Sequence, residues 1–351
     1  MVEYLDGGRI QGISTLTTAP PQTSWKEIAR TTLSSASDTI TVNNIPTRDN
    51  LMIIPYVYDE GSNQVYGQGR FNNDSGNNYA NRWSRNGGSD STNTSQSEMI
   101  TYFAGSAYGE FGVFEMANIA NQEKLLIDQG VGADATGACT APKRHEGVHK
   151  WANTSNQVTR FDYINGGGGT FGTGSEVVVL GYNDDEADSG TNFWQELANV
   201  TVTSGTTISS GTFTAKKYLM FDLYFNASGS GGQPKLQVGN SSVDTGSNYA
   251  TRRSSNGSED TLTSQDVIYP YTGGQNTSWY VKGFIINKSD KEKLFIMECN
   301  EQTTAGAGNA PTRCETVAKW TNTSNQINIM KFTSHNSIAI GNAKLTVWGA
   351  D

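Results

Sequence analysis

The chain has 351 residues, so its length favours two domains of about 170 residues each. Charged residues make up only 17% of the chain, aromatic residues make up 10%, and there are 39 glycines. Helix formers are scarce and no long window repeats apolar residues every 3.6 positions, which argues against a helical bundle or a doubly wound α/β enzyme. The composition instead predicts short strands joined by many turns.

The charge balance excludes further classes. Lys and Arg total 25 against 34 Asp and Glu, a net charge of −9, so we expect no nucleic-acid binding. No stretch approaches the eighteen or so apolar residues of a membrane span, and the first residues lack the basic and apolar regions of a signal peptide. We therefore expect a chain made in the cytoplasm.

In chain order, residues 1–23 are expected to form an N-terminal arm that lies against another surface. Six β-branched and aromatic runs that follow, several with a period of two, are predicted strands. These runs cover residues 39–45, 51–58, 109–119, 123–128, 157–164 and 175–182.

The second half of the chain repeats the first. DSGNNYANRWSRNG at 74–87 returns as DTGSNYATRRSSNG at 244–257, an offset of 170 residues. KWANTSNQ from Lys150 returns as KWTNTSNQ from Lys319, an offset of 169. Because the offset changes so little, we infer duplication of one domain, with copies at 24–182 and 193–351 joined by an acidic linker at 183–192.

About eight short strands in 160 residues, without a βαβ rhythm, are typical of a sandwich. We therefore predict an all-β chain of two tandem, duplicated antiparallel β-sandwich domains of jelly-roll-like topology. In the KW(A/T)NTSNQ blocks, Trp151 and Trp320 are expected to point inward at a strand start, before a polar turn.

These repeated motifs carry a resemblance. The set resembles a β-sandwich domain that recurs in virion structural proteins of tailed marine bacteriophages and archaeal viruses. The matching segments are 74–80, 86–87, 151–157 and 166–181 in the first copy, and 244–250, 256–257 and 320–326 in the second. The second copy departs before its last strand, where HNSIAIGNAK stands in place of GGGGTFGTGS.

The resemblance implies a non-enzymatic role on the virion surface, as capsid decoration, head fibre or tail appendage. The expected partners are identical subunits, with a trimer favoured, and other virion proteins, and the arm at 1–23 is expected to dock on a neighbouring subunit or on the capsid shell. The chain is expected to be made in the host cytoplasm and located in the virion. Two alternatives stay open: a double jelly-roll major capsid protein, and an adhesin that binds host surface glycans. For the glycan alternative the candidate contacts are Trp83, Tyr79 and Tyr249; Trp83 corresponds to Arg253 in the other copy, whereas the two tyrosines correspond to each other.

The segment RHEGVHKW contains the spacing of a zinc-binding helix, with His145, Glu146 and His149. Gly147 and the following strand block argue against a helix, and in a strand the two histidines would lie about 13 Å apart. The other copy has Cys314 and Ala318 at these positions. We interpret the segment as a solvent-facing strand and predict no metal, cofactor or catalytic residues.

Other acidic candidates have no recognisable pattern. Asp59, Glu60, Glu110, Glu115 and Asp128 are expected on the solvated surface rather than as a catalytic carboxylate pair. The linker acids Asp184, Asp185, Glu186 and Asp188 lack the spacing of a calcium loop and are interpreted as a solvated hinge.

The three cysteines are too few for a disulfide framework. Cys299 and Cys314 are expected as two small buried thiols, and whether they pair across a hairpin stays open.

Overall fold

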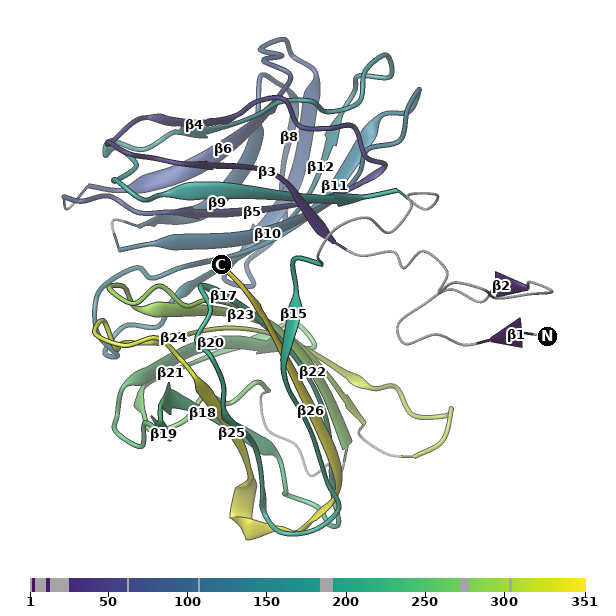
Figure 1. Cartoon of the computed structure of the whole chain (residues 1–351), viewed down its shortest axis with the longest axis vertical. Helices are drawn as coiled ribbons and strands as arrows, with labels where there is room; N and C mark the ends of the chain where they lie inside the picture. Colours follow the sequence, from purple (N-terminus) through teal and green to yellow (C-terminus); the bar gives the residue numbers. More distant parts are fainter. Residues whose placement is uncertain are drawn as a thin grey trace.

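The computed structural model describes residues 2–3, 11–12, 25–61, 63–106, 108–183, 192–271, 278–302 and 305–351, and the side chains of all of these except 2–3, 11–12 and 102–106. Strands β1 (Val2–Glu3) and β2 (Gln11–Gly12) pair with each other. The rest of the predicted arm, and the linker acids from Asp184 to Asp188, lie outside the described residues. The described chain forms two lobes, stacked along the long axis in Figure 1.

The first lobe contains β3–β14 in two antiparallel sheets. Its large sheet has the order β3 (Lys26–Thr32), β14 (Glu176–Tyr182), β5 (Asn50–Val57), β10 (Glu110–Ala117), β11 (Lys124–Gly132), β12 (Lys143–Trp151), β7 (Tyr79–Arg85) and β8 (Ser91–Gln96). Its small sheet has the order β4 (Thr39–Val42), β13 (Phe161–Asn165), β6 (Val65–Phe71) and β9 (Met99–Ser106).

The second lobe repeats this arrangement with β15–β26. Its large sheet has the order β15 (Gln195–Val202), β26 (Ile340–Ala350), β17 (Tyr218–Ala227), β22 (Ser278–Ile286), β23 (Lys293–Gln302), β24 (Thr312–Trp320), β20 (Tyr249–Ser255) and β21 (Ser258–Gln265). Its small sheet has the order β16 (Thr207–Thr212), β25 (Ile329–Ser334), β18 (Pro234–Asn240) and β19 (Ser242–Val243). The 3₁₀ turn η1 (His335–Ser337) is the sole helical element of the described residues.

The strands of each lobe are nested. The first strand of the first lobe pairs with the last, β3 with β14, and the second pairs with the second-last, β4 with β13. The second lobe follows the same rule through β15 with β26 and β16 with β25. Nested antiparallel pairing across two sheets is jelly-roll-like, so the predicted fold class, two tandem duplicated β-sandwiches, is confirmed.

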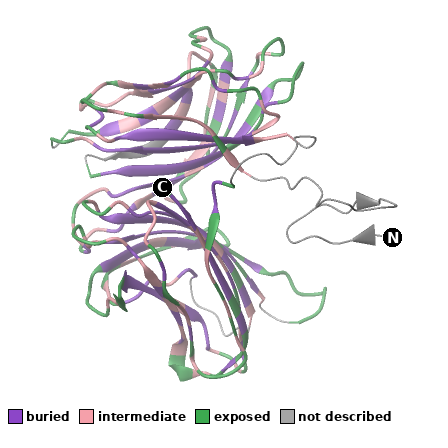
Figure 2. Cartoon of the chain, in the orientation of Figure 1, coloured by how far each residue is buried: buried purple, intermediate pink, exposed green. Residues whose placement is uncertain are grey.

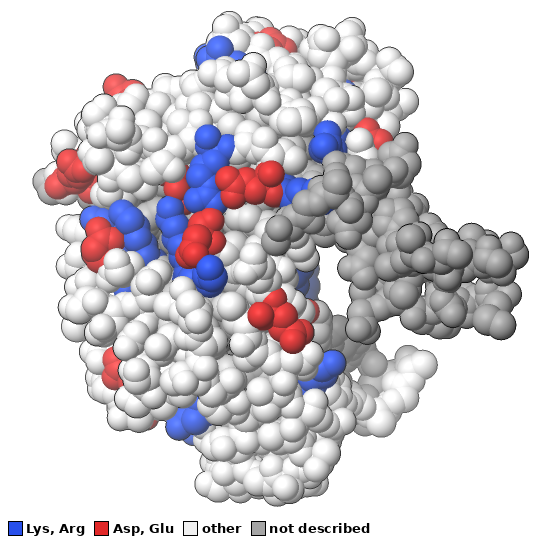
Figure 3. All heavy atoms as spheres, viewed as in Figure 1, with Lys and Arg blue, Asp and Glu red and all other residues white. Residues whose placement is uncertain are grey.

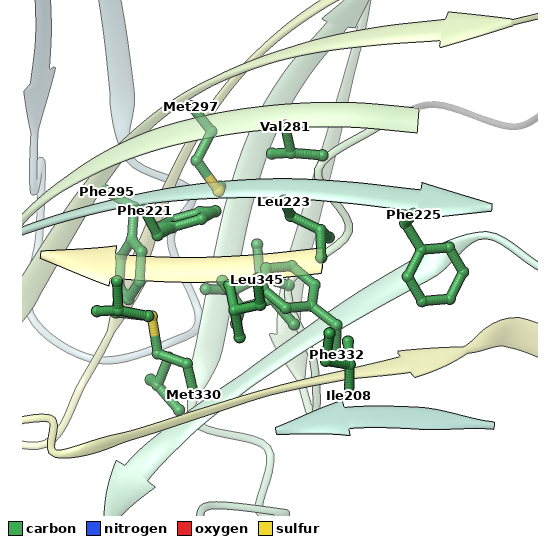
Figure 4. Packing of buried hydrophobic residues seen from close by; sticks show 14 of the residues in the cluster. Ile208, Phe221, Leu223, Phe225, Val281, Phe295, Met297, Met330, Phe332 and Leu345 are labelled. Atoms are coloured by element: carbon green, nitrogen blue, oxygen red, sulfur yellow. The ribbon is translucent and has the colours of Figure 1, made fainter. Parts of the chain in front are cut away.

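Each lobe has an apolar core between its two sheets, and burial follows the strands in Figure 2. Figure 4 shows side chains from both sheets of the second lobe meeting in its core, among them Phe221, Leu345 and Phe332. Trp151 and Trp320 are 1% exposed and point inward as predicted, but each is the last residue of its strand rather than the first.

A third apolar cluster joins the lobes. It contains outward-facing residues of the two large sheets, including Tyr56 and Phe111 from the first lobe and Leu294 and Ile296 from the second. Strands β4 and β6 of the first small sheet lie in the upper part of the molecule in Figure 1, and β18, β19 and β25 of the second small sheet lie in its lower part. On the face drawn in Figure 3, charged side chains gather along the boundary between the lobes, whereas most of the remaining described surface is uncharged.

Candidate functional site

Strands β7, β11 and β12 bring together a buried polar cluster inside the first lobe. Asp128 on β11 lies directly opposite Gly147 on β12, and His145 and His149 flank this glycine two positions away on either side. All four residues therefore share the inner face of the large sheet. The imidazole Nε2 of His145 lies 3.1 Å from Oδ2 of Asp128, and Nε2 of His149 lies 3.0 Å from Oδ1.

This geometry corrects two predictions. His145 and His149 are 1% and 3% exposed, so the strand does not turn them to solvent. The distance of about 13 Å applies to the backbone, whereas the side chains lean toward each other over Gly147. A Cβ at position 147 would lie 2.2 Å from Oδ1 of Asp128 and 2.8 Å from Nε2 of His149, so this position must be glycine for the cluster to close.

The carboxylate of Asp128 is also buried, contrary to its prediction as a solvated acid, and so is Glu110. Burial by itself raises the pKa of Asp128, but the charges and hydrogen bonds of His145 and His149 outweigh it and hold this pKa well below its usual range. Glu115, by contrast, is exposed on the outer face of the sheet.

The orientation of His149 is fixed by Asn81, which lies directly opposite on β7. Nδ1 of His149 is 2.7 Å from Oδ1 of Asn81. The main chain holds this amide, since Nδ2 of Asn81 donates to the carbonyl of Glu98 and Oδ1 accepts from the N–H of Ile100. Oδ1 is therefore the acceptor and Nδ1–H of His149 is the donor.

The second lobe builds the same sheet without this cluster. At the matching positions of the second lobe, Met297 replaces Asp128 and lies opposite Thr316, which replaces Gly147. The two histidines are replaced as well, His145 by Cys314 and His149 by Ala318. Figure 4 shows Met297 among the apolar side chains of the second core. The fold therefore does not require the polar cluster.

The three candidate glycan contacts have different environments. Tyr79 and Tyr249 are 1% and 0% exposed, and their hydroxyls bond to main-chain groups of β6 and β18. Neither ring is accessible to a sugar, so this part of the prediction is corrected. Trp83 is half-buried, and its indole stacks on the His145 ring at 5.8 Å between centroids.

A second feature lies on the outer face of the large sheets. In the second lobe, Trp194, Leu294, Ile296 and Val317 are 5%, 1%, 4% and 2% exposed because they pack against the first lobe. Beside them, Lys319 donates to the main-chain carbonyls of Ala133 and Ala135 in the first lobe. We call these five residues the docked face.

The first lobe carries the same residue types at the matching positions: Trp25, Leu125, Ile127, Val148 and Lys150. Here Leu125, Ile127 and Val148 are 58%, 61% and 49% exposed. They line an open groove of about 850 Å³, which also contains Trp25 and Lys150. We call these five residues the free face. Large exposed apolar patches often mark interaction sites, so the free face is a candidate for one.

The described cysteines are not joined by a disulfide, and Cys139 is exposed whereas Cys299 and Cys314 are buried. Cys299 on β23 lies directly opposite Cys314 on β24, so the two do face each other, and both are buried as predicted. Within the described residues, no helix has the length and apolar character needed to cross a bilayer.

No family model and no curated protein matches the chain. Among solved structures, domains LG4-5 of the mouse laminin alpha1 chain are 12% identical, with 95% of this chain and 92% of that chain covered and a TM-score of 0.21. The LG1-3 region of the laminin alpha2 chain is 8% identical, with 90% and 64% covered and a TM-score of 0.22. Scores this low carry no conclusion about function.

Proposed function

We propose that this chain is a non-enzymatic virion structural protein, displayed on the particle surface and assembled through self-association. Its motifs resemble those of virion β-sandwich proteins. The observation that carries the self-association is the free face, since it repeats five residues that already form a protein contact elsewhere in the same chain.

The contact between the lobes is heterologous, because two different surfaces meet. The docked face of the second lobe packs on outer-face residues of β5, β10, β11 and β14 in the first lobe. A heterologous contact, repeated between chains, generates a ring when the rotation closes and a filament when it does not. The free face of one chain thus needs an acceptor surface on the next chain.

The acceptor surface can be located on the second lobe, at the positions that match the part of the first lobe contacted by the docked face. Register places Tyr224 and Tyr280 of β17 and β22 at the positions of Tyr56 and Phe111. Both tyrosines are exposed, at 44% and 48%. Aromatic residues are enriched at protein interfaces because they bury a large area and keep a polar end. We take these two residues as the centre of the acceptor surface, and a closed trimer as the product.

Two single variants test this arrangement. Ile127→Asp places a charge on the free face and Tyr280→Asp places one on the acceptor surface, so each should yield monomers in sedimentation. An equimolar mixture should yield dimers, because each variant keeps one intact surface. Association through two free faces would instead leave Tyr280→Asp assembled on its own, and adding Ile127→Asp would produce no further dimers, which would contradict the heterologous contact.

The virion role is tested on particles. An antibody against the chain should label the surface of intact particles, and the chain should be found in purified particles by mass spectrometry. Its absence from particles would overturn the virion role without touching the self-association result. Hundreds of copies tiling the shell would identify the major capsid alternative instead.

A further inference from the structure

We propose that Asp128, His145 and His149 form a binding site for one divalent transition-metal ion of the zinc or cobalt type. The three side chains are the group of potential ligands that the described residues bring together, with donor atoms all within 4.8 Å of one another. The site lies inside the first lobe, and the inference does not depend on the proposed function.

The hydrogen bonds of His149 point to a cation in the cluster. Because Nδ1–H donates to Asn81, the Nε2 atom of a neutral His149 carries a lone pair. This lone pair faces Oδ1 of the Asp128 carboxylate at 3.0 Å. Two electron-rich atoms at that distance repel unless a positive charge lies between them. A metal ion supplies this charge and binds both atoms, as imidazole and carboxylate ligands do.

The spacing also fits. Zn²⁺ takes imidazole nitrogen and carboxylate oxygen at roughly 2.0–2.2 Å, so neighbouring donors of a tetrahedral site lie roughly 3.3–3.6 Å apart. Nε2 of His149 lies 3.0 Å from Oδ1 of Asp128 and Nε2 of His145 lies 3.1 Å from Oδ2, so each histidine is within a few tenths of an ångström of this spacing from one carboxylate oxygen. One ligand atom from each of the three residues lies within 4.8 Å of the others, so a small rotation of the carboxylate brings one oxygen to both nitrogens. Three protein ligands leave a fourth position for water.

The residues around the three ligands also support a metal site. Asn81 orients His149 through its second ring nitrogen, the arrangement that usually fixes a metal-bound histidine. Gly147 keeps the space between the ligands open, and Trp83 stacks on His145. The second lobe, with Met297, Cys314 and Ala318, lacks this donor set. One ion per chain is therefore expected.

The test is titration of the full chain, first dialysed against a chelator, with Co²⁺ and Zn²⁺. Co²⁺ should give visible d–d absorption that saturates at one ion per chain, and calorimetry with Zn²⁺ should give the same stoichiometry. His149→Ala, which installs the residue found in the second lobe, should abolish this uptake. His335→Ala should not change it, because His335 lies in η1 of the second lobe.

A positioning variant separates binding from folding. Asn81→Thr, again the second-lobe residue, keeps all three ligands and should weaken Zn²⁺ affinity about 10- to 100-fold. Absence of saturable uptake by the unaltered chain, or equal uptake by a folded His149→Ala variant, would overturn the proposal. In that case the positive charge is a second proton on His149, which nitrogen-15 NMR of the imidazole would reveal.

Discussion

Trp151 donates its indole Nε1–H to Oδ2 of Asp74 over 2.7 Å, from the end of β12 to the turn before β7. The second lobe repeats this bond at 2.8 Å between Trp320 and Asp244. Each aspartate also accepts the N–H of a glycine two residues on, Gly76 or Gly246. The two motifs that revealed the duplication are therefore the two ends of one hydrogen-bonded link.

We predict that Asp74→Ala destabilises the first lobe. It leaves the indole N–H of Trp151, at a residue that is 1% exposed, without its acceptor, and it removes the bonds that shape the turn. Loss of one partner of such a bond costs about 1–3 kcal/mol, so the urea midpoint should fall.

The control for this prediction is a double-mutant cycle with Trp151→Phe. Because both substitutions remove the same bond, their effects should be less than additive by roughly 0.5–3 kcal/mol. Fully additive effects would show that the bond does not contribute to stability.

The strands and the duplication could be predicted because both are local in sequence. The runs at 51–58 and 175–182 match β5 and β14 to within one residue at each end. The polar turn after Trp151 is likewise present, with Oδ1 of Asn153 accepting the N–H groups of Ser155 and Asn156.

The polar cluster was missed because spacing along one strand does not describe where side chains converge. The signal was present in Gly147, midway between His145 and His149, since a glycine there lets both rings lean toward the neighbouring strand. Asp128, their common partner, comes from β11 and is found only once the strand register is known.

The docked and free faces could not be predicted, because the same residue types have opposite exposures in the two lobes. Ile127 is 61% exposed and Ile296 is 4% exposed. Which copy is covered depends on how the lobes pack, and no pattern within either copy specifies that.

We predict that acid weakens the contact between the lobes through Glu176. Burial opposes ionisation of this carboxyl group, but bonds from Lys217, Tyr218 and Thr32 and the charge of Lys217 outweigh it and lower its pKa. A lowered carboxyl pKa contributes stability that is complete above the unfolded-state value of about 4.3 and is lost as pH falls through the folded-state value below it.

Glu176→Gln tests this directly. It should lower stability at pH 7 by about 1.5–3 kcal/mol, the usual contribution of a hydrogen bond to a charged group, and flatten the dependence of stability on pH below about 4.3. Glu196→Gln, at an exposed position, should leave the thermal midpoint and its acid dependence unchanged. Equal acid dependence in the unaltered chain and Glu176→Gln would exclude this origin.

We predict that one thiol of the native chain reacts rapidly with a thiol reagent. Cys139 is exposed, whereas Cys299 and Cys314 are buried, and the bond to Cys314 together with burial raises the pKa of the Cys299 thiol. Since the thiolate is the reactive form, a chromogenic thiol reagent should modify one cysteine per native chain and all three after unfolding. Recovery of a single thiol after unfolding would show that Cys299 and Cys314 are joined by a disulfide.

Ile296 on the docked face and Ile127 on the free face are a matched pair for testing the contact between the lobes. Ile296→Ala removes a side chain packed against the first lobe and should cost about 2–5 kcal/mol, measured by urea unfolding of the dilute monomer. Ile127→Ala makes the same change on the free face, where exposure should limit the effect to within about 0.5 kcal/mol. Because residue type and strand position are the same, the difference measures what the second lobe gains from docking. Equal losses in the two variants would mean that the lobes do not depend on this contact.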